Sequence, residues 1–328
     1  MGGNAIVGAV RVDKSTFNSV TALLDYELEC RDYKSQVIAA YREKQTFGDV
    51  DILVSDRLFK EMTPKQIAKQ IFLDENAPFS KNGNVLSVGW ALNASTYLQV
   101  DLIATPEEEW DFALNYFSWN DIGNLIGRIA HKMGLKFGHD GLWMPMRDGT
   151  NLFHSVLLTR DFDEALKLLG YDPEVYACGF DSLEDIFKYT ASSPYFNPSI
   201  YLLENRNHTA RTRDRKRKVY MEFLDWLVNY EGNQYEWNPD KEQYLAQIFD
   251  HFPEAEIEYD HAKEELYVQQ EVKKKFNGLI VADLTGLQGK DLGELMSKLT
   301  KTYPFNDKDA LYGMSPEEII SKIKEFQL

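Results

Sequence analysis

The segment AAYREKQTFGDVDILV occupies residues 39–54, and within it residues 49–52 alternate between carboxylate and apolar side chains. The apolar residues at 50, 52 and 54 fall on one face of an extended chain, whereas Asp49 and Asp51 fall on the other. A face made of Val, Ile and Val gains free energy when other apolar side chains cover it. We therefore predict a β-strand that is buried on one face and presents two carboxylates from the other.

A second pair of strands is predicted further along the chain. Residues 85–90 and 97–104 are rich in apolar side chains, and the Asn-Ala-Ser segment at residues 93–95 between them is typical of a hairpin turn. Within the second of these strands, Gln99 and Asp101 share one face. If this strand lies near residues 49–54, Asp101 adds a third carboxylate to the first two.

Helical periodicity surrounds the strands in the first half of the chain and dominates the second half. Apolar residues recur at helical spacing near residues 17–28, 64–72, 106–117 and 121–133. After about residue 150 the strand patterns fade, and helices are predicted near residues 161–169, 182–190, 219–230, 241–252, 262–276 and 316–326. The predicted fold class is α+β, with a mixed or antiparallel sheet and flanking helices in residues 1–150 and a mostly helical C-terminal domain in residues 151–328.

Three carboxylates directed at one point are costly without cations, because like charges repel each other. Mg²⁺ prefers oxygen ligands and commonly combines one or two carboxylates with substrate phosphates. Two such ions about 4 Å apart assist nucleotidyl transfer by activating a 3′-hydroxyl and stabilising the departing pyrophosphate. Two aspartates on one strand are also a short and common pattern, so a solvated strand face is the alternative interpretation of Asp49 and Asp51.

The surrounding residues favour the metal-binding interpretation. Residues 48–51 read GDVD, residues 99–102 read QVDL, and residues 116–128 read YFSWNDIGNLIGR before HKMGL at 131–135. In this order and spacing, the motifs within residues 35–145 resemble the DNA polymerase beta superfamily of nucleotidyltransferases, in particular its family X polymerases. Residues 195–230 resemble, more faintly, nucleotidyltransferases encoded by large bacterial viruses.

This resemblance implies a nucleotidyltransferase palm in residues 1–150. It implies that Asp49, Asp51 and Asp101 are catalytic and bind two divalent ions, Mg²⁺ or Mn²⁺, against an NTP or dNTP. The nucleotide-binding residues that it implies are Ala39, Ala40, Arg42, Gly48, Tyr116, Phe117, Asn124 and Arg128.

Some of these implied residues receive specific roles from the resemblance. Tyr116 and Phe117 would bracket the sugar, Asn124 would contact the base edge, and Arg128 would contact the templating side. Asn124 and Arg128 are four residues apart on one predicted helix and therefore face the same site. The alternatives are that the two aromatic residues belong to an ordinary core and that the other two lie on a solvated helix face.

The chain also departs from the family pattern. Ala39 and Ala40 replace a Gly-Ser pair whose hydroxyl and backbone amides cradle the triphosphate, and Glu43 replaces a second arginine. Gln99 stands where the polymerases have an arginine near the primer end, and Trp119 replaces a glycine beside the sugar. We expect neither a lyase domain nor a DNA-gripping helix-hairpin-helix, because the sequence before residue 39 is short.

The formal net charge of −16 opposes general binding to nucleic acid, because the average surface repels phosphates. Contact with an RNA or DNA acceptor must therefore be local, and one dense basic segment in the helical half is suited to it. Its predicted nucleic-acid-binding residues are Arg206, Arg211, Arg213, Arg215, Lys216, Arg217 and Lys218. A solvated helix start is the alternative interpretation of this segment.

Composition narrows the cellular setting. No apolar run approaches the roughly 20 residues that a membrane helix needs, and Met1 to Val7 lacks the features of a signal peptide, so a cytoplasmic protein without membrane contact is expected. Cys30 and Cys178 form no CxxC or Cys/His cluster. They are predicted to be reduced thiols in the core.

The function predicted from these features is metal-dependent transfer of a nucleotide from an NTP or dNTP to a nucleic-acid 3′-hydroxyl, with release of pyrophosphate. Three alternatives stay open at this point: a template-directed DNA polymerase, nucleotidyl transfer to a protein hydroxyl, and a non-catalytic binding protein. The base, the ribose type and the oligomeric state leave no signal in the sequence.

Overall fold

The structure of the protein is a computed structural model, which describes residues 5–326 of the 328-residue chain. Part of the segment on which the signal-peptide expectation rests, residues 1–4, lies outside the described residues. The chain forms two compact units, one made of residues 1–144 and 157–252 and the other of residues 145–156 and 253–328. Mixed α and β structure followed by a helical C-terminal part is confirmed.

The division between the units differs from the boundary expected near residue 150. Residues 157–252 pack on the N-terminal part because they supply aromatic side chains to its core. The Phe162 ring lies 5.1 Å from that of Phe112 and 5.6 Å from that of Phe137. The hydroxyl of Tyr201 also donates to the carbonyl oxygen of Leu125 at 3.2 Å.

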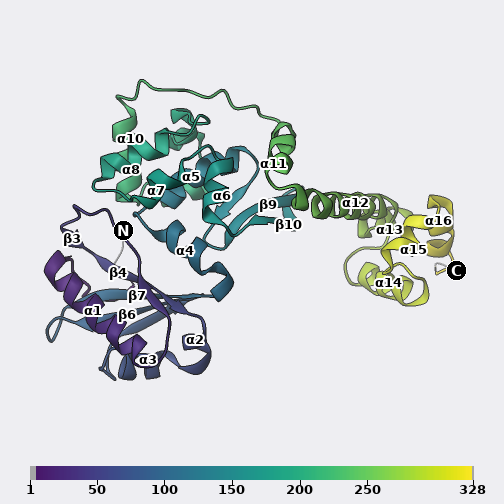
Figure 1. The fold of residues 1–328 in the computed structure, drawn as a ribbon. Helices are drawn as coiled ribbons and strands as arrows, with labels where there is room; N and C mark the ends of the chain where they lie inside the picture. Colours follow the sequence, from purple (N-terminus) through teal and green to yellow (C-terminus); the bar gives the residue numbers. More distant parts are fainter. Residues whose placement is uncertain (1–4, 327–328) are drawn as a thin grey trace. The chain divides into compact units, whose positions relative to one another are not determined.

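A five-stranded mixed sheet organises the first unit (Figure 1). Its strands, in spatial order, are β2 (Ser35–Val37), β4 (Asp49–Ser55), β7 (Tyr97–Thr105), β6 (Val85–Ala91) and β5 (Phe79–Asn82). β4 and β7 pair in parallel, and the other pairs are antiparallel. The predicted strand at residues 49–54 and the predicted hairpin are therefore confirmed. A two-stranded sheet of β1 (Val12–Asp13) and β3 (Thr46–Phe47) stands beside this sheet.

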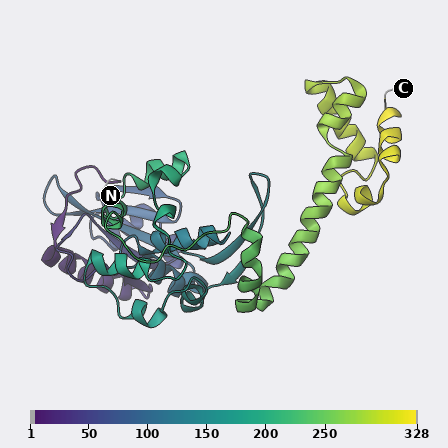
Figure 2. The ribbon, with the colours of Figure 1, turned by 90° about the horizontal axis from the view of Figure 1, so that it is seen from above.

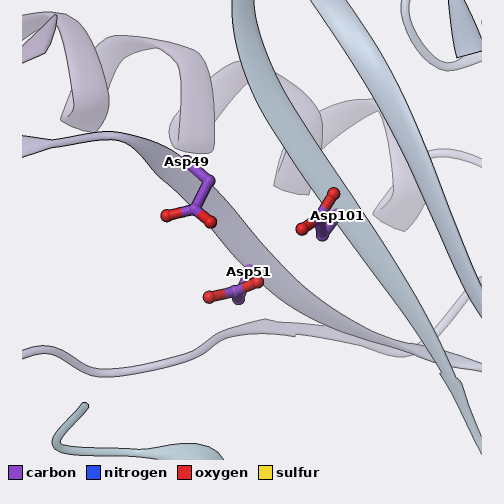
Figure 3. Close-up of side chains that lie close together, drawn as sticks. All are labelled: Asp49, Asp51 and Asp101. Atoms are coloured by element: carbon purple, nitrogen blue, oxygen red, sulfur yellow. The ribbon is translucent and has the colours of Figure 1, made fainter. Parts of the chain in front are cut away.

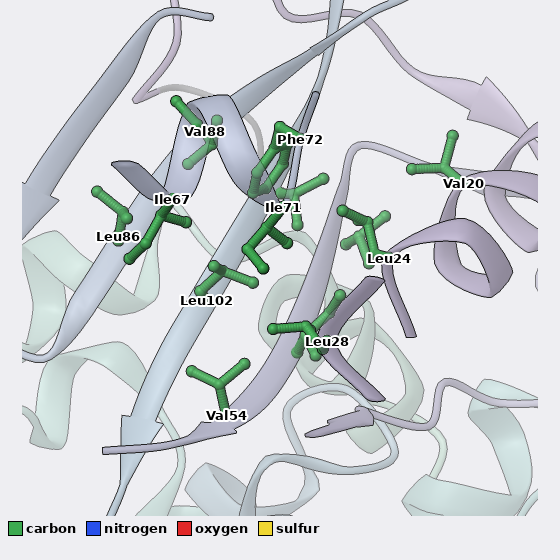
Figure 4. Packing of buried hydrophobic residues seen from close by; sticks show 14 of the residues in the cluster. Val20, Leu24, Leu28, Val54, Ile67, Ile71, Phe72, Leu86, Val88 and Leu102 are labelled. Carbon is green, nitrogen blue, oxygen red and sulfur yellow. The ribbon is translucent and has the colours of Figure 1, made fainter. Parts of the chain in front are cut away.

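The apolar face of β4 is covered by two helices, α1 (Lys14–Glu29) and α3 (Pro64–Gln70). Asp13 caps α1 by accepting a hydrogen bond from the backbone N–H of Thr16, and Thr63 forms a capping box with Gln66 at the start of α3. The buried cluster beneath these helices is drawn in Figure 4. Its labelled members are Val20, Leu24, Leu28, Val54, Ile67, Ile71, Phe72, Leu86, Val88 and Leu102.

The opposite face of the sheet changes character along its length. At one end it carries the three aspartates, and further along both strands it becomes apolar at Leu53 and Ile103. These two residues pack against Trp110 of α4 (Trp110–Phe117), which follows a short 3-10 turn at Glu107–Glu109. The helix therefore covers the apolar end and leaves the carboxylate end uncovered.

The remaining elements of the first unit are mostly short helices. They are α2 (Arg57–Glu61), α5 (Ile122–Lys132), α6 (Phe162–Leu168), α7 (Pro173–Ala177), α8 (Leu183–Ala191), α9 (His208–Asp214), α10 (Lys218–Leu227) and α11 (Leu245–His251), with 3-10 turns at Pro198–Ile200, Leu203–Asn205 and Lys241–Tyr244. A three-stranded sheet of β8 (Lys136–Gly138), β9 (Gly141–Asp148) and β10 (Asn151–Thr159) was not predicted. The expectation that strands end near residue 150 is therefore wrong for residues 151–159.

The second unit consists mainly of a long helix and four shorter ones (Figure 2). They are α12 (Pro253–Lys275), α13 (Gly278–Thr285), α14 (Gly289–Thr302), α15 (Lys308–Gly313) and α16 (Pro316–Lys324). Val281, Leu299 and Ile323 lie at the centre of their own apolar core. Among the described residues, no helix has the length and apolar character needed to cross a membrane.

Both cysteines carry free thiols, but they are exposed. The prediction that Cys30 and Cys178 lie in the core is therefore wrong. Each residue follows the last turn of a helix, Cys30 after α1 and Cys178 after α7, where its side chain points outward.

Candidate metal and nucleotide site

The three aspartates converge because β4 and β7 are parallel neighbours in register. Asp51 is paired with Asp101 across the two strands, and Asp49 is paired with Gln99. One carboxylate oxygen from each aspartate lies within 4.8 Å of those from the other two (Figure 3). All three residues are half-buried, and theirs is the one such cluster of potential metal ligands within residues 5–326. The predicted convergence is therefore present in the structure.

The electrostatics of this carboxylate triad, Asp49, Asp51 and Asp101, favour a bound cation. Burial, together with the neighbouring charges of Asp49 and Asp101, raises the pKa of Asp51 to about 8. The pKa of Asp49 is raised by burial and then by Asp101, and burial also raises that of Asp101. The three carboxylates offer only oxygen ligands, which a hard divalent ion prefers. The charge of such an ion would offset the repulsion among the ionised carboxylates.

Gln99 fixes the orientation of Asp101. Its side-chain amide donates to both carboxylate oxygens of Asp101, at 2.9 and 3.0 Å. Its carbonyl oxygen accepts from the backbone N–H groups of Ala5 and Ile6, at 2.8 and 3.2 Å. Gln99 is almost fully buried, so it is a supporting residue of the triad with no surface open to a primer strand.

A cleft of about 740 Å³ opens beside the triad. Among the predicted site residues, its lining includes Ala39, Ala40, Gly48, Asp49, Asp51, Phe117 and Lys218. Its other lining residues include Arg11, Glu43, Lys44, Asn120, Asp121 and Glu222. The cleft has the size that small-molecule sites commonly have, roughly 300–1,000 Å³.

Two of the segments that carry predicted motifs, residues 39–54 and residues 116–128, meet at the wall of the cleft. The backbone N–H of Trp119 donates to the carbonyl oxygen of Ala39 at 2.7 Å. Trp119 and Asn120 adopt left-handed backbone angles, with φ of 59° and 64°. Glycine adopts such angles most readily, and Trp119 stands where the family pattern has a glycine. The backbone there keeps a glycine-like conformation although the side chain is large.

The two predicted sugar-binding aromatics have different surroundings. Phe117 lines the cleft, whereas the ring of Tyr116 packs 5.6 Å from that of Phe137. The rings of Tyr116 and Phe117 lie edge to face, with centroids 5.4 Å apart. Burial raises the pKa of Tyr116. Phe117 is thus placed to contact a ligand in the cleft, and Tyr116 supports it from behind.

Arg42, predicted to clamp phosphate, is engaged elsewhere. Its guanidinium pairs with Asp181 at 2.6 Å and donates to the carbonyl oxygen of Cys178. The backbone N–H groups of Arg42 and Glu43 donate to the carbonyl oxygens of Phe180 and Asp181, at 3.0 and 2.9 Å. These contacts hold the segment before β4 against residues 178–181, and phosphate binding by Arg42 stays a prediction.

Asn124 and Arg128 do share one helix face, on α5, but that face is covered. The guanidinium of Arg128 donates to Asn124 at 3.2 Å and to Asp214 at 3.0 Å. Arg128 is 8% exposed and Asp214 is fully buried. Neither interpretation given above, a template contact or a solvated face, describes Arg128, which takes part in a buried ion pair.

In the basic segment 206–218, some residues pair with acids of the first unit and others are exposed to solvent. Arg206 and Arg213 join Arg128 around Asp214, at 3.3 and 3.2 Å. Arg217 pairs with Asp121. The members left exposed are Arg213, Arg215, Lys216 and Lys218. Only this outward subset is available to an acceptor, and Arg213 already has a carboxylate partner.

Several residues of the site carried too little sequence signal to be assigned. Lys44 lies in an irregular turn, where no strand or helix period gives the direction of a side chain. Asp181 and Asp214 lie far from their partners in the sequence. Asp214 is the single acid among the seven basic residues of the segment 206–218. Its isolation was the one signal in the sequence of a buried ion pair.

Three carboxylates, a cleft and two converging motifs thus lie in one unit of the chain. Comparison of the whole sequence with known proteins gives no further evidence about this site. No protein-family model matches the sequence, and no curated protein matches it either.

Proposed function

We propose that this chain is a metal-dependent nucleotidyltransferase that moves a nucleotide from an NTP or dNTP to a nucleic-acid 3′-hydroxyl and releases pyrophosphate. The observation that carries the proposal is the triad. Three carboxylates from two parallel strands have oxygens within 4.8 Å of one another, and two of them, those of Asp49 and Asp51, line a cleft of nucleotide size. We infer that the five-stranded sheet corresponds to the palm of the DNA polymerase beta superfamily.

Asp49, Asp51 and Asp101 would hold two divalent ions, Mg²⁺ or Mn²⁺. When bound, such ions lower the pKa of an attacking hydroxyl and neutralise charge on phosphate oxygens. Gln99 keeps the Asp101 carboxylate in position through two hydrogen bonds. Phe117 offers an apolar surface to the sugar, and Gly48 permits close approach of a phosphate to the backbone.

Transfer without a template is favoured over template-directed synthesis. The template contact implied for Arg128 requires an accessible guanidinium, and this guanidinium is buried against Asp214. A protein hydroxyl is the second candidate acceptor. It is favoured by the net charge of −16 and by the inward direction of Arg206 and Arg217.

The test is incubation of the protein with each labelled NTP and dNTP and with Mg²⁺ or Mn²⁺. The acceptors are an RNA, a DNA primer, a DNA primer-template and the protein itself. We expect label in a nucleic-acid product that is independent of the template, and turnover at least about 10²-fold lower in Asp49→Asn, Asp51→Asn and Asp101→Asn.

Asp56→Asn is the matched control, because Asp56 follows β4 directly but pairs with Lys60 away from the cleft. Its turnover should equal that of the wild type. Near wild-type turnover in all three triad variants at limiting Mg²⁺ would show that the triad is not the catalytic site. Label recovered only in protein after nuclease treatment would identify the second acceptor.

A further inference from the structure

One cation of the cleft makes neither a hydrogen bond nor an ion pair with the described residues. Its lining includes three basic side chains, those of Arg11, Lys44 and Lys218. The Arg11 guanidinium donates to the backbone and side-chain oxygens of Thr46, at 2.7 and 3.1 Å. Lys218 pairs with Glu222 at 3.5 Å. Within the part of the chain that the structure describes, the Lys44 ammonium has neither a hydrogen-bond acceptor nor a carboxylate at ion-pair distance.

The surroundings hold Lys44 in place. Its ammonium lies over the ring of Phe47, 4.9 Å from the ring centroid, and Phe47 stacks on Phe17 with centroids 3.9 Å apart. The backbone N–H of Lys44 donates to the carbonyl oxygen of Tyr41 at 3.1 Å. The Lys44 side chain is half-buried, and the acidic groups whose charges act on it are Asp49 and Asp51.

An anion beside the triad would give this ammonium a direct partner. A divalent ion on the triad neutralises the aspartates that now face Lys44, which leaves the ammonium free to bind a ligand. A triphosphate presents several anionic oxygens, and a lysine binds such oxygens as a compact point charge. Arg42, the other candidate for this role, is engaged by Asp181 and the Cys178 carbonyl.

We infer that Lys44 is the residue of this cleft that binds the triphosphate of the donor, in the role that the resemblance implies for Arg42. This inference rests on the proposed function for the identity of the donor. The chemistry that it requires is narrower, namely a polyphosphate bound together with a divalent ion next to Asp49 and Asp51.

Two measurements test the inference. The first is the affinity of the full chain for inorganic triphosphate in the presence of Mg²⁺, measured by calorimetry, which requires no transfer reaction. The second is the KM for the NTP or dNTP. Lys44→Met should weaken triphosphate binding and raise KM by about 10- to 100-fold, because it removes a charge-assisted hydrogen bond. Lys44→Arg keeps the charge and should restore most of the affinity.

Lys65→Met is the matched control, because Lys65 is exposed on α3, which covers the opposite face of the sheet. It should bind triphosphate as the wild type does, and Arg42→Ala should have a smaller effect than Lys44→Met. Unchanged melting temperatures of the variants would exclude misfolding as the cause of weaker binding.

The outcomes separate this inference from the proposed function. Loss of triphosphate binding in Lys44→Met without any transfer by the wild type would support the role of Lys44 and contradict nucleotidyl transfer. Transfer by the wild type with unchanged affinity and KM in Lys44→Met would contradict the role of Lys44 alone. A wild-type protein that binds no triphosphate would also overturn the inference, as would a larger effect of Arg42→Ala.

Discussion

At the scale of single residues, the pKa of Asp51 determines how the metal-free protein responds to pH. The pKa is about 8 in the folded protein, against the ordinary aspartate value of 3.8. Between these values the folded state keeps a proton that the unfolded state has lost, so the stability falls as the pH rises from about 4 to about 8. Above that range both states are ionised, and the loss of stability is complete.

Asp51→Asn should therefore raise the melting temperature in a chelator at pH 8, by roughly 2 °C or more, and by much less at pH 5. The neutral amide removes the cost of burying a charge and the repulsion from Asp49 and Asp101 without a large change in volume. Addition of Mg²⁺ should raise the melting temperature of the wild type and leave that of the variant unchanged. Differential scanning calorimetry at the two pH values measures both effects.

Asp250→Asn is the control for this prediction, since Asp250 is an exposed residue in the same unit. It should show no pH-dependent gain in stability. An Asp51→Asn protein that melts below the wild type at pH 8 in the chelator would mean that Asp51 is ionised and well stabilised without metal.

At the scale of secondary-structure elements, Asp214 joins three parts of the first unit. It ends α9 and accepts hydrogen bonds from Arg128 of α5 and from Arg206, which follows a 3-10 turn. Its carboxylate is fully buried, and the tyrosine ring of α10, Tyr220, lies 5.8 Å from the Arg128 guanidinium. The helices are thus held together by one acid and its guanidinium partners.

Asp214→Asn should lower the free energy of unfolding by about 3–5 kcal/mol, because buried guanidinium groups lose their counter-charge. Urea unfolding followed by circular dichroism measures this change. Asp225→Asn, on the exposed side of α10, is the control and should change the value by less than about 0.5 kcal/mol. Equal effects of the two substitutions would show that the ion pair does not stabilise the helices.

Elements with a regular period were predictable from the sequence. Strand β4 and the hairpin of β6 and β7 follow from alternation, and α1 and α3 follow from spacing and caps. Strand β10 was missed because most of its residues are only partly buried. In β9, Leu142, Met144 and Met146 are buried on one face, but the residues between them, Trp143 and Pro145, are also apolar, so the sequence shows no alternation there. The sequence therefore indicated the sheet and the triad but not the later strands.

The rest of the site depends on contacts between distant residues. Nothing in the sequence near Arg42 indicates that Asp181 is its partner, and nothing near Arg128 indicates Asp214. Helical spacing correctly placed Asn124 and Arg128 on one face. It could not tell whether that face meets solvent, a ligand or a buried acid.

At the scale of the whole molecule, the net charge of −16 sets a barrier to polynucleotide binding. The exposed cations Arg215, Lys216 and Lys218 are the part of the basic segment suited to overcome it. Arg213 and Arg217 are unsuitable for a test, because they pair with Asp214 and Asp121 and their loss would disturb the fold.

Joint replacement of Arg215, Lys216 and Lys218 by Gln should weaken acceptor binding. For each phosphate contact that the substitutions remove, the negative slope of log affinity against log salt should also become less steep by about 0.7–0.9. Acceptor affinity measured by fluorescence anisotropy across a salt titration tests both expectations. Binding of Mg²⁺ and triphosphate should be changed little in the double variant Arg215→Gln and Lys216→Gln, which keeps the cleft residue Lys218.

The control triple, Lys298→Gln, Lys301→Gln and Lys308→Gln, makes the same change in net charge on exposed residues of the second unit. It should leave the slope unchanged. Superimposable salt curves for the wild type and the first triple would exclude the basic segment as the acceptor contact and would favour a protein acceptor.

The backbone hydrogen bonds from Arg42 and Glu43 to Phe180 and Asp181 have a consequence for folding during translation. The carboxylate triad needs only the chain up to Asp101, whereas these bonds need a segment that is translated 80 residues later. At about 5–20 residues per second, that delay lasts roughly 4 to 16 seconds. During this time both strands that carry the triad are already synthesised, while the loop that carries Lys44 is still untethered.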